Sequence, residues 1–436
     1  MINGKLTDFY KQYDFIFPDT KELTQKILLD MEKGLCIPSG QENSADQPMI
    51  VASHKIPHCI PSSTSAIVID AGGTNFRSAL VTIDENHKFT ISDVEKTKMP
   101  AVDKELSKDD FYDAIAKNLD HLKNKATKIG FCFSYAMEIT KDGDGKILFF
   151  SKEVKAPQAI GTYVGKELKI ALEKRGWKNI EKITLLNDTT ASLLSGTIAS
   201  ATNQKFSSYI GFILGTGLNN AYIEYSPIKK INDDESLEHI IVCEGGFFSG
   251  LSQSVFDKEL DAASSKPGQS PLEKMCSGAY LGTIVQNALK HACLDNLFSK
   301  QFSDEFFKIE QITPFDMDTY FNAPKDFNTK LGSLIKNATC DDVILFEQIM
   351  KDVIYRAAII VSSLLCASLL KSEKGQNEEE PICIVANGTT FWKTHNLYPQ
   401  ICSLLEKTLC GQWKRHYKIV QIENDITLGT CAAAFM

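Results

Sequence analysis

Hydrophobic positions change their period along this chain of 436 residues, and each period predicts a different kind of element. Residues 8–33 place Phe, Tyr, Ile and Leu at helical spacing, which predicts a helical start before a polar loop. From Ala66 onward, short β-rich runs over 67–71, 76–83 and 89–94 predict a meander of strands. The chain therefore changes from helix to sheet within its first hundred residues.

Helices and strands then alternate, which is typical of an α/β fold. The expected order is helix 109–123, strand 129–133, helix 163–175, strand 183–186, helix 191–199, and strands 209–214, 221–225 and 240–242. Within "MEITKDGDGKILFF", Asp142 and Asp144 have a spacing that resembles part of a calcium loop. The other ligand positions are missing, so a hairpin turn is the preferred interpretation.

The second half of the chain is mainly helical. Helical patterns fill 255–371, and their longest apolar run, 357–370, falls short of the roughly 20 residues that span a bilayer. It is therefore expected to be a buried helix. A polar stretch follows, and the remaining elements are expected to be a strand at 382–386, a helix at 397–409, a strand at 419–422 and a last short helix.

Length and composition exclude several classes of protein. The chain is longer than one hydrophobic core usually reaches, so two lobes are expected. Its net charge of -8, with scattered lysines and arginines, argues against a nucleic-acid partner. The 12 cysteines include no Cys-x-x-Cys pair and the 8 histidines form no cluster, so neither zinc nor a disulfide framework is predicted. The chain starts without a secretory signal pattern, so a cytoplasmic protein is expected, either monomer or homodimer, with no transmembrane segment.

Two stretches predict phosphate-binding hairpins. In "AIVIDAGGTNFRSALVTI" (66–83), glycines between two strands expose backbone N–H groups, so a polyphosphate can approach the main chain closely. An acid at the end of the first strand is placed to hold Mg²⁺ through water, and an arginine is placed to meet a phosphate. Taken alone, this is also the pattern of any tight turn. The residues in question are Asp70, Gly72, Gly73, Thr74, Asn75 and Arg77.

The second stretch, "GFILGTGLNNAYIEY", again runs from strand to strand through a turn, which is formed by Gly215, Thr216 and Gly217. The chain has no G-x-x-x-x-G-K-[ST] and no G-x-G-x-x-G after a strand, so the usual helix-capping phosphate grip is not predicted. Two such turns, one from each lobe, instead indicate a nucleotide clamped from both sides.

Between the two hairpins, "ITLLNDTTASLLSG" delivers Asn187 and Asp188 to the end of a strand, and a helix is expected to start at Thr189. One interpretation is helix capping, in which Asp188 or Thr189 accepts bonds from the first-turn N–H groups. The other is catalytic: a carboxylate at this place, near two phosphate loops, suits a general base for a hydroxyl. Both interpretations stay open from this segment alone.

These stretches resemble the hexokinases and glucokinases within the actin-like ATPase superfold. The matching motifs run in order along nearly the whole chain: "MEKGL", "DAGGTNFRSALV", "GFCFSYAME", "LLNDTTASLLSG", "GFILGTGLNNAYIE", "CEGGFF", "PGQSPLEKMCSGAYLG", "IYRAAIIVSSLLCASLL" and "ANGTTF". The resemblance implies an α/β, two-lobed actin-like ATPase (ribonuclease H-like) fold with a cleft between a small and a large domain. The small domain is expected at 66–187, completed by a C-terminal helix at 425–436, and the large domain at 1–65 and 188–424.

The resemblance also assigns roles. Asp188 is the implied catalytic base, and the positions that match the family's sugar-binding residues are Ser134, Ser151, Lys152, Asn187, Asp188, Asn219, Glu244 and Glu273. Carboxylates and amides suit a ring of hydroxyls because they pair with both donors and acceptors. Taken alone, Glu244 is only an acid in a turn and Glu273 only an acid on a surface helix. The two glycine hairpins, together with Gly388 and Thr389 on the adenosine side, are implied to hold ATP with Mg²⁺.

Several positions depart from the family pattern and leave the sugar preference open. Ala136 stands in place of Pro, Ser151 and Glu153 in place of the Thr and Gly of T-K-G, and Gly245 in place of a Trp. Thr427 and Leu428 stand where a glycine-serine-glycine-lysine run is usual, which leaves the preferred nucleotide open.

The activity that the resemblance implies is phosphorylation of a hexose, glucose first, at its 6-hydroxyl by ATP. This is the first step of glycolysis. One alternative is a catalytically weak, hexokinase-like sugar sensor, but no damage at Asp188, Asp70 or the phosphate loops favours it. An actin-like chaperone or filament ATPase is a second alternative, and it leaves the sugar-binding set unexplained.

Overall fold

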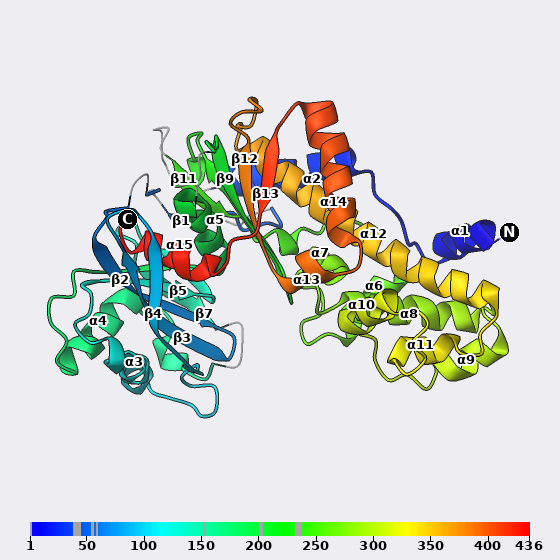
Figure 1. The fold of residues 1–436 in the computed structure, drawn as a ribbon, viewed down its shortest axis with the longest axis horizontal. Coiled ribbons are helices and arrows are strands. Elements are labelled where there is room, and N and C mark those ends of the chain that lie inside the picture. The colour runs from blue at the N-terminus through cyan, green and yellow to red at the C-terminus, as the bar shows by residue number, and fades with distance from the viewer. Residues whose placement is uncertain are drawn as a thin grey trace.

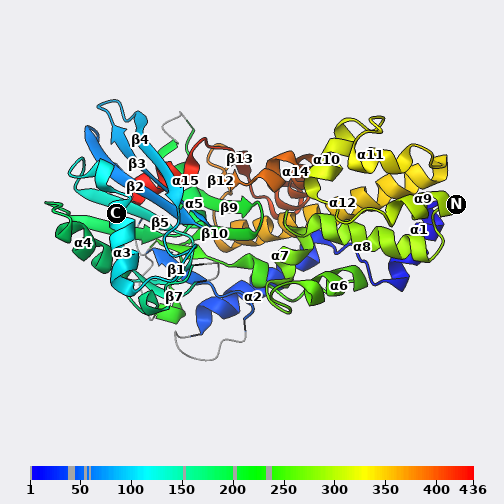
Figure 2. The same cartoon turned by 90° about the horizontal axis from the view of Figure 1, so that it is seen from below.

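The computed structural model describes residues 2–37, 45–53, 56–57, 60–150, 154–199, 204–231 and 238–436. The molecule is elongated, with its two larger sheets in one half and a group of helices in the other (Figures 1 and 2). The two sheets are α/β units of mixed strand direction, as the alternation of helix and strand predicts.

The first sheet has five strands in the order β4-β3-β2-β5-β8. The strands are β2 Thr64–Gly72, β3 Asn75–Ile83, β4 Phe89–Lys98, β5 Lys128–Phe133 and β8 Lys182–Leu186. β2, β3 and β4 form the predicted antiparallel meander, while β5 and β8 extend β2 in parallel. Helices α3 Lys108–Lys117 and α4 Val164–Lys174 share a hydrophobic core with this sheet.

A short hairpin, β6 Ala136–Ile139 and β7 Gly145–Phe149, lies beside this sheet and contains the stretch that resembles a calcium loop. Asp142 there accepts a hydrogen bond from the Thr140 hydroxyl at 2.5 Å, and Asp144 accepts the backbone N–H groups of Gly165 and Lys166. The hairpin interpretation is confirmed, and both aspartates serve turns and the start of α4.

The second sheet has six strands in the order β1-β11-β10-β9-β12-β13. The strands are β1 Ile50–Ser53, β9 Ser208–Leu214, β10 Leu218–Glu224, β11 His239–Val242, β12 Ile382–Asn387 and β13 Tyr417–Val420. Two helices, α5 Asp188–Ala199 and α15 Asp425–Ala433, share a hydrophobic core with strands of both sheets. Small residues permit the close packing, because a side chain on Gly429 would collide with the backbone of Ala191.

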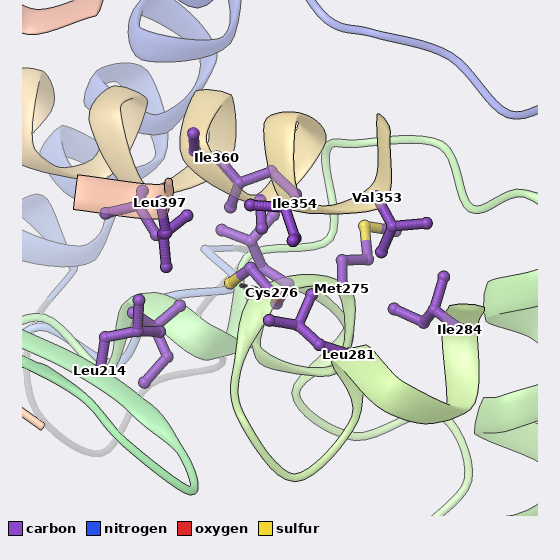
Figure 3. Packing of buried hydrophobic residues seen from close by; sticks show 14 of the residues in the cluster. Leu214, Met275, Cys276, Leu281, Ile284, Val353, Ile354, Ile360 and Leu397 are labelled. Atoms are coloured by element: carbon purple, nitrogen blue, oxygen red, sulfur yellow. Dashed lines mark hydrogen bonds between the residues drawn. The ribbon is translucent and has the colours of Figure 1, made fainter. Parts of the chain in front are cut away.

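The remaining helices pack against one another and against the second sheet in the largest hydrophobic core. They are α1 Ile2–Gln12, α2 Thr20–Cys36, α6 Val255–Ala263, α7 Pro271–Cys276, α8 Leu281–Leu294, α9 Lys300–Phe306, α10 Pro314–Asn322, α11 Lys330–Ile335, α12 Cys340–Lys371, α13 Thr389–Lys393 and α14 Leu397–Leu405. Figure 3 shows Met275 of α7 beside Val353 and Ile354 of α12 within this core.

Several short helical elements remain among the described residues. They are the 3-10 turns Asp120–Leu122, Pro157–Ala159, Lys229–Ile231 and Gly245–Phe247, and the π-helical segment Glu406–Trp413.

Helix α12 contains the longest apolar run. In the part of the chain that the structure describes, it is the one helix long and apolar enough to cross a membrane, but 89% of its apolar window is buried inside the protein. The prediction of a buried helix at this run is therefore confirmed.

Several element boundaries differ from the sequence-based expectations. The helical start is two helices, because Asp14 adopts a left-handed backbone (φ 55°) and Asp19 caps α2 by accepting the N–H groups of Lys21 and Glu22. The expected helix 109–123 ends at Lys117, and the C-terminal helix expected over 425–436 ends at Ala433. Local caps and turns set these ends, and hydrophobic spacing does not encode them.

Candidate functional site

The turn between β2 and β3 has the predicted form. Gly72 pairs with Asn75 across the ladder, which leaves Gly73 and Thr74 as the turn. Gly73 has φ +61°, a left-handed conformation that favours glycine. The Tyr135 hydroxyl donates to the Gly73 carbonyl at 2.8 Å, so the turn is braced from outside the hairpin. Thr74 and Asn75 are exposed, as a ligand-facing turn requires.

The second glycine turn, between β9 and β10, is held from two sides. The Gly215 carbonyl accepts the N–H of Gly278 and the hydroxyl of Thr390, both at 2.8 Å. Gly388, at the end of β12, has φ 117° and leaves no room for a side chain against the backbone of Leu214. The predicted residues of this turn and of the adenosine side therefore lie next to one another.

A pocket of about 690 Å³ opens beside this turn. Of the predicted nucleotide residues, Gly215, Thr216, Gly388 and Thr389 line it. The other lining residues are Ile213, Gly278, Ala279, Pro314, Ala386, Asn387, Thr390, Trp392, Lys393, Gln421, Ile422, Glu423, Asn424 and Asp425. Its apolar walls and its volume suit a nucleoside-sized group.

Asn187 and Asp188 lie where β8 ends and α5 begins, so the helix starts one residue before the expected Thr189. Asn187 Oδ1 accepts the Thr190 N–H, and Asp188 Oδ1 accepts the Thr189 N–H, each at 2.8 Å. Asp188 therefore accepts a first-turn N–H group as the capping interpretation predicts, and Asn187, which that interpretation did not name, accepts another. This capping does not exclude the catalytic interpretation, because a carboxylate has a second oxygen and several acceptor positions.

Asp70 lies on β2, directly opposite Arg77 on β3. Burial raises the pKa of the Asp70 carboxyl to about 6; the positive charge of Arg77 lowers it, and the negative charges of Asp188 and Asp425 raise it. Strands β2, β5 and β8 run parallel, so the carboxyl ends of β2 and β8 lie at the same edge of the sheet. The charges of Asp188, at this edge, and of Asp425, at the start of α15, thus both act on Asp70.

Glu244 and Asn219 are joined by two hydrogen bonds. Asn219 Nδ2 donates to Glu244 Oε1 at 2.7 Å, and Asn219 Oδ1 accepts the backbone N–H of Glu244 at 3.1 Å. Burial raises the pKa of Glu244 to about 7, against the lowering effect of the Asn219 bond, and the charges of Asp188 and Glu273 raise it further. Glu244 also has a left-handed backbone (φ 55°), which is uncommon for a residue with a side chain.

Glu273 and Ser134 connect the predicted sugar residues to the glycine turns. Glu273 Oε2 accepts the N–H of Leu218, the residue that follows the second turn, at 2.8 Å. A side chain on Gly72 would lie 3.1 Å from Ser134 Oγ, so Ser134 touches the first turn. The predicted residues Ser151 and Lys152 lie outside the described residues.

Gly245 departs from the family pattern for a structural reason. A side chain at this position would collide with the Oδ1 atom of Asn220 and with Leu364 of α12. Asn220 is fully buried and its amide donates to Ser368 Oγ at 2.8 Å. Asn220 and Leu364 therefore fill the space that a larger residue after Glu244 needs.

Two family models, both described as hexokinase, match this chain over residues 5–198 and 209–436. The chain belongs to the hexokinase family. It is 26% identical to glucokinase-1 of Saccharomyces cerevisiae, a match that covers 94% of this chain and 93% of the relative. It is 28% identical to hexokinase-1 of Mus musculus over 89% of this chain, and it spans only 41% of that relative's length.

Solved hexokinase structures have the same fold. A hexokinase from Schistosoma mansoni complexed with glucose superposes with a TM-score of 0.75 at 21% identity and covers 99% of this chain and 98% of its own. A second hexokinase crystal structure superposes with a TM-score of 0.72 at 18% identity, covering 96% of this chain and 94% of its own. The expected two-lobed actin-like ATPase fold is confirmed.

Sequence reasoning missed part of the candidate site. Asp425 is buried at the start of α15, where it accepts the Asn387 amide at 2.7 Å and the Ser192 hydroxyl at 2.8 Å. Trp392 and Pro314 form apolar walls of the pocket. Asp425 follows shortly after a strand, as Asp188 does, and that repeated pattern is the signal that points to it. No comparable signal marks Trp392 or Pro314.

The residues at this edge fit a magnesium ion bound together with phosphates. Among the described residues, no group of three or more His, Cys, Asp or Glu side chains forms a metal cage. Mg²⁺ usually keeps several waters and needs only one or two carboxylates plus the phosphates of its substrate. Asp70, whose pKa is raised by burial and by neighbouring carboxylates, is a position where a cation would relieve repulsion.

Proposed function

We propose that this protein is an ATP:hexose 6-phosphotransferase, with glucose as the first candidate substrate. The observation that carries the proposal is the position of Asp188. Its charge acts on Asp70 beside the first glycine turn and also on Glu244 in the predicted sugar pocket. A hydroxyl held between these groups would meet both a base and a phosphoryl donor.

In the proposed reaction, Asp188 accepts the proton of the sugar's 6-hydroxyl while that oxygen forms a bond to the γ-phosphorus of ATP. The bond between the γ-phosphorus and the bridging oxygen breaks, and ADP leaves with the bonding electrons. Asn219, Glu244 and Glu273 orient the ring through its other hydroxyls. Most of the rate enhancement in such a transfer comes from positioning and from stabilising charge on the phosphoryl oxygens.

The donor side of the proposed site combines the two glycine turns with the pocket beside Gly388. Backbone N–H groups of the turns suit the phosphates, and the pocket near Trp392 suits the nucleoside. Bound Mg²⁺, near Asp70, would supply neutralisation of charge on the phosphates. Lys152 and Ser151 are proposed sugar contacts on the strength of the family motif alone.

The choice of glucose has two supports. Family members named glucokinase match this chain, and the Schistosoma mansoni hexokinase structure contains glucose. The departures at Ala136, Ser151 and Gly245 are in the sequence motifs that carry the proposed sugar residues, so the hexose range is to be determined by experiment. We also propose a cytoplasmic role in the first step of glycolysis.

A coupled assay tests this function. ADP production would be followed with glucose, fructose, mannose and N-acetylglucosamine, each with ATP and with alternative phosphoryl donors. Sugar-dependent ADP formation with at least one hexose is the expected result. Hexose binding with no turnover for any donor would instead favour the sugar-sensor alternative.

We further propose that residues 66–187 with the C-terminal helix form a small domain that closes on the large domain when a hexose binds. Closure would exclude water, which competes with the sugar as a phosphoryl acceptor.

Glucose at about 100 times its dissociation constant should stabilise the protein by about 2.7 kcal/mol, because only the folded protein binds it. The same addition should compact the molecule. Thermal unfolding and small-angle scattering with and without glucose measure the two effects. L-Glucose is the matched control and should change neither. A scattering profile that no hexose alters would contradict closure.

A further inference from the structure

Lys274 is a buried lysine that directly follows Glu273 in α7. Its side chain is only 4% exposed. Its Nζ atom donates to Asp261 Oδ1 at 2.5 Å, to Ser264 Oγ at 3.0 Å and to the carbonyl of Lys266 at 2.7 Å. An ammonium group has three N–H donors, so all of them are used here. Breaking any one of these bonds would leave an unsatisfied N–H group on a buried charge. The three partners of Lys274 are therefore held in one arrangement.

Asp261, the carboxylate of α6 that Lys274 contacts, is also bound by the loop 264–270, which contains Ser264 and Lys266. Both of its carboxylate oxygens accept the N–H of Gly268, at 3.1 and 2.9 Å. Burial raises the pKa of Asp261, but the bonds from Lys274 and Gly268 outweigh burial and hold this pKa below its usual value. The loop 264–270 is therefore fastened to α6 and to α7 although most of its residues are exposed.

Helix α7 depends on such tertiary contacts for its position. It has six residues, far fewer than an isolated helix needs to persist in water. Met275 and Cys276 pack into the core beside α12 (Figure 3). Those apolar contacts fix the end of the helix in the core, and the Lys274 bonds fasten the same turn to α6 and to the loop that precedes α7.

Glu273 directly precedes Lys274 in α7. Its Oε2 atom accepts the Leu218 N–H at 2.8 Å, and a side chain on Gly217 would lie 2.7 Å from the same atom. Its Cβ atom lies close to Gly246 on the other side. The Glu273 carboxylate thus fits a narrow space between the second glycine turn and the turn after Glu244, and a small displacement of α7 removes it from that space.

We infer that Lys274, fastened to Asp261 and the 264–270 loop, is a positioning residue that places the Glu273 carboxylate against the Leu218 N–H and in the sugar pocket. The part of this inference that concerns sugar rests on the proposed function. The part that concerns Leu218 does not. A site residue must be held within about 0.5 Å of its productive position by its supporting contacts, and Lys274 supplies such contacts.

The first test needs no ligand. In Lys274→Met, the Leu218 amide loses a well-placed acceptor, so its hydrogen exchange should accelerate about tenfold or more. Exchange at Leu218 is measured by NMR or by mass spectrometry of overlapping peptides. Lys230→Met is the matched control, because Lys230 is also a lysine that donates to loop carbonyls, those of Pro48 and Met49. Its Leu218 exchange should equal that of the wild type.

The second test measures glucose affinity in a double-mutant cycle. Lys274→Met should weaken glucose binding roughly tenfold and change the KM for Mg-ATP less than about twofold. In a Glu273→Gln background, the same change should have little further effect, because the group that Lys274 positions is already altered. Asp261→Asn provides a second, milder break of the same arrangement if Lys274→Met folds poorly.

Three outcomes decide the inference. Unchanged Leu218 exchange in both folded variants overturns it, whatever the protein binds. Additive losses of glucose affinity in the cycle also overturn it, because they make Lys274 act independently of Glu273. If the wild type binds no hexose, the proposed function fails, and accelerated exchange at Leu218 would still support the positioning role.

Discussion

Asp188→Asn is expected to lower turnover by about 10²- to 10⁴-fold while the fold and most sugar binding remain. The amide has nearly the same shape as the carboxylate, and its oxygen can still accept the Thr189 N–H that Asp188 Oδ1 accepts now. It cannot take a proton from the attacking hydroxyl. Rates at saturating sugar and Mg-ATP, with glucose affinity measured separately, provide the comparison.

Asp70→Asn is the matched variant for this experiment, because it removes a carboxylate from the same edge of the sheet. If Asp70 assists Mg²⁺, its loss should raise the Mg-ATP requirement more than it lowers turnover at saturation. Near-wild-type phosphorylation by Asp188→Asn would show that Asp188 is not the base. If both variants change turnover and the Mg-ATP requirement to the same extent, the assignment of Asp188 as the base and Asp70 as the metal residue would be contradicted.

The sheets were predictable from sequence because their signals are local. Short β-rich apolar runs on either side of the glycine pair Gly72 and Gly73 define β2 and β3, and the predicted strands differ from the observed ones by a few residues at most. The break between α1 and α2 was not predictable from spacing, because a left-handed residue at Asp14 and a cap at Asp19 end a pattern that hydrophobic positions continue.

The candidate site was predictable only where a motif marks it. Asp188, Glu244 and Gly388 stand in stretches that resemble the hexokinase family; in the structure Gly388 lines the pocket, and the charge of Asp188 acts on Glu244. Trp392 reaches the same region through the packing of α13, which no local pattern encodes, and the only sequence signal for Asp425 is its place shortly after a strand. Nor does sequence spacing reveal that Lys274 contacts Asp261, since that bond depends on how the intervening loop turns.

Glu244→Gln should make the ligand-free protein more stable at pH 8 and at the same time weaken its binding of glucose. Glu244 has a pKa of about 7 in the folded protein against 4.5 for the ordinary side chain. The folded protein therefore binds this proton more tightly than the unfolded chain does. The stabilising contribution of the protonated group is complete below about pH 4.5 and is lost as the pH rises to about 7.

Glutamine carries no proton to lose, so the variant should not show this part of the pH dependence. At about 1.4 kcal/mol per unit of pKa, its free energy of unfolding should exceed that of the wild type by on the order of 3 kcal/mol at pH 8 and match it at pH 4. Denaturant unfolding at the two pH values measures the difference. Glu85→Gln, at an exposed position, is the control and should follow the wild type.

The affinity of Glu244→Gln for glucose should fall, although its stability at pH 8 rises. A charged carboxylate accepts hydroxyl bonds that are roughly twice as strong as those a neutral amide accepts, so the variant should bind glucose about tenfold more weakly. A gain in stability with a loss of affinity means that the burial of Glu244 serves the ligand at the expense of the empty protein. Parallel pH profiles for the variant and the wild type would show instead that Glu244 remains charged and hydrated in the folded protein.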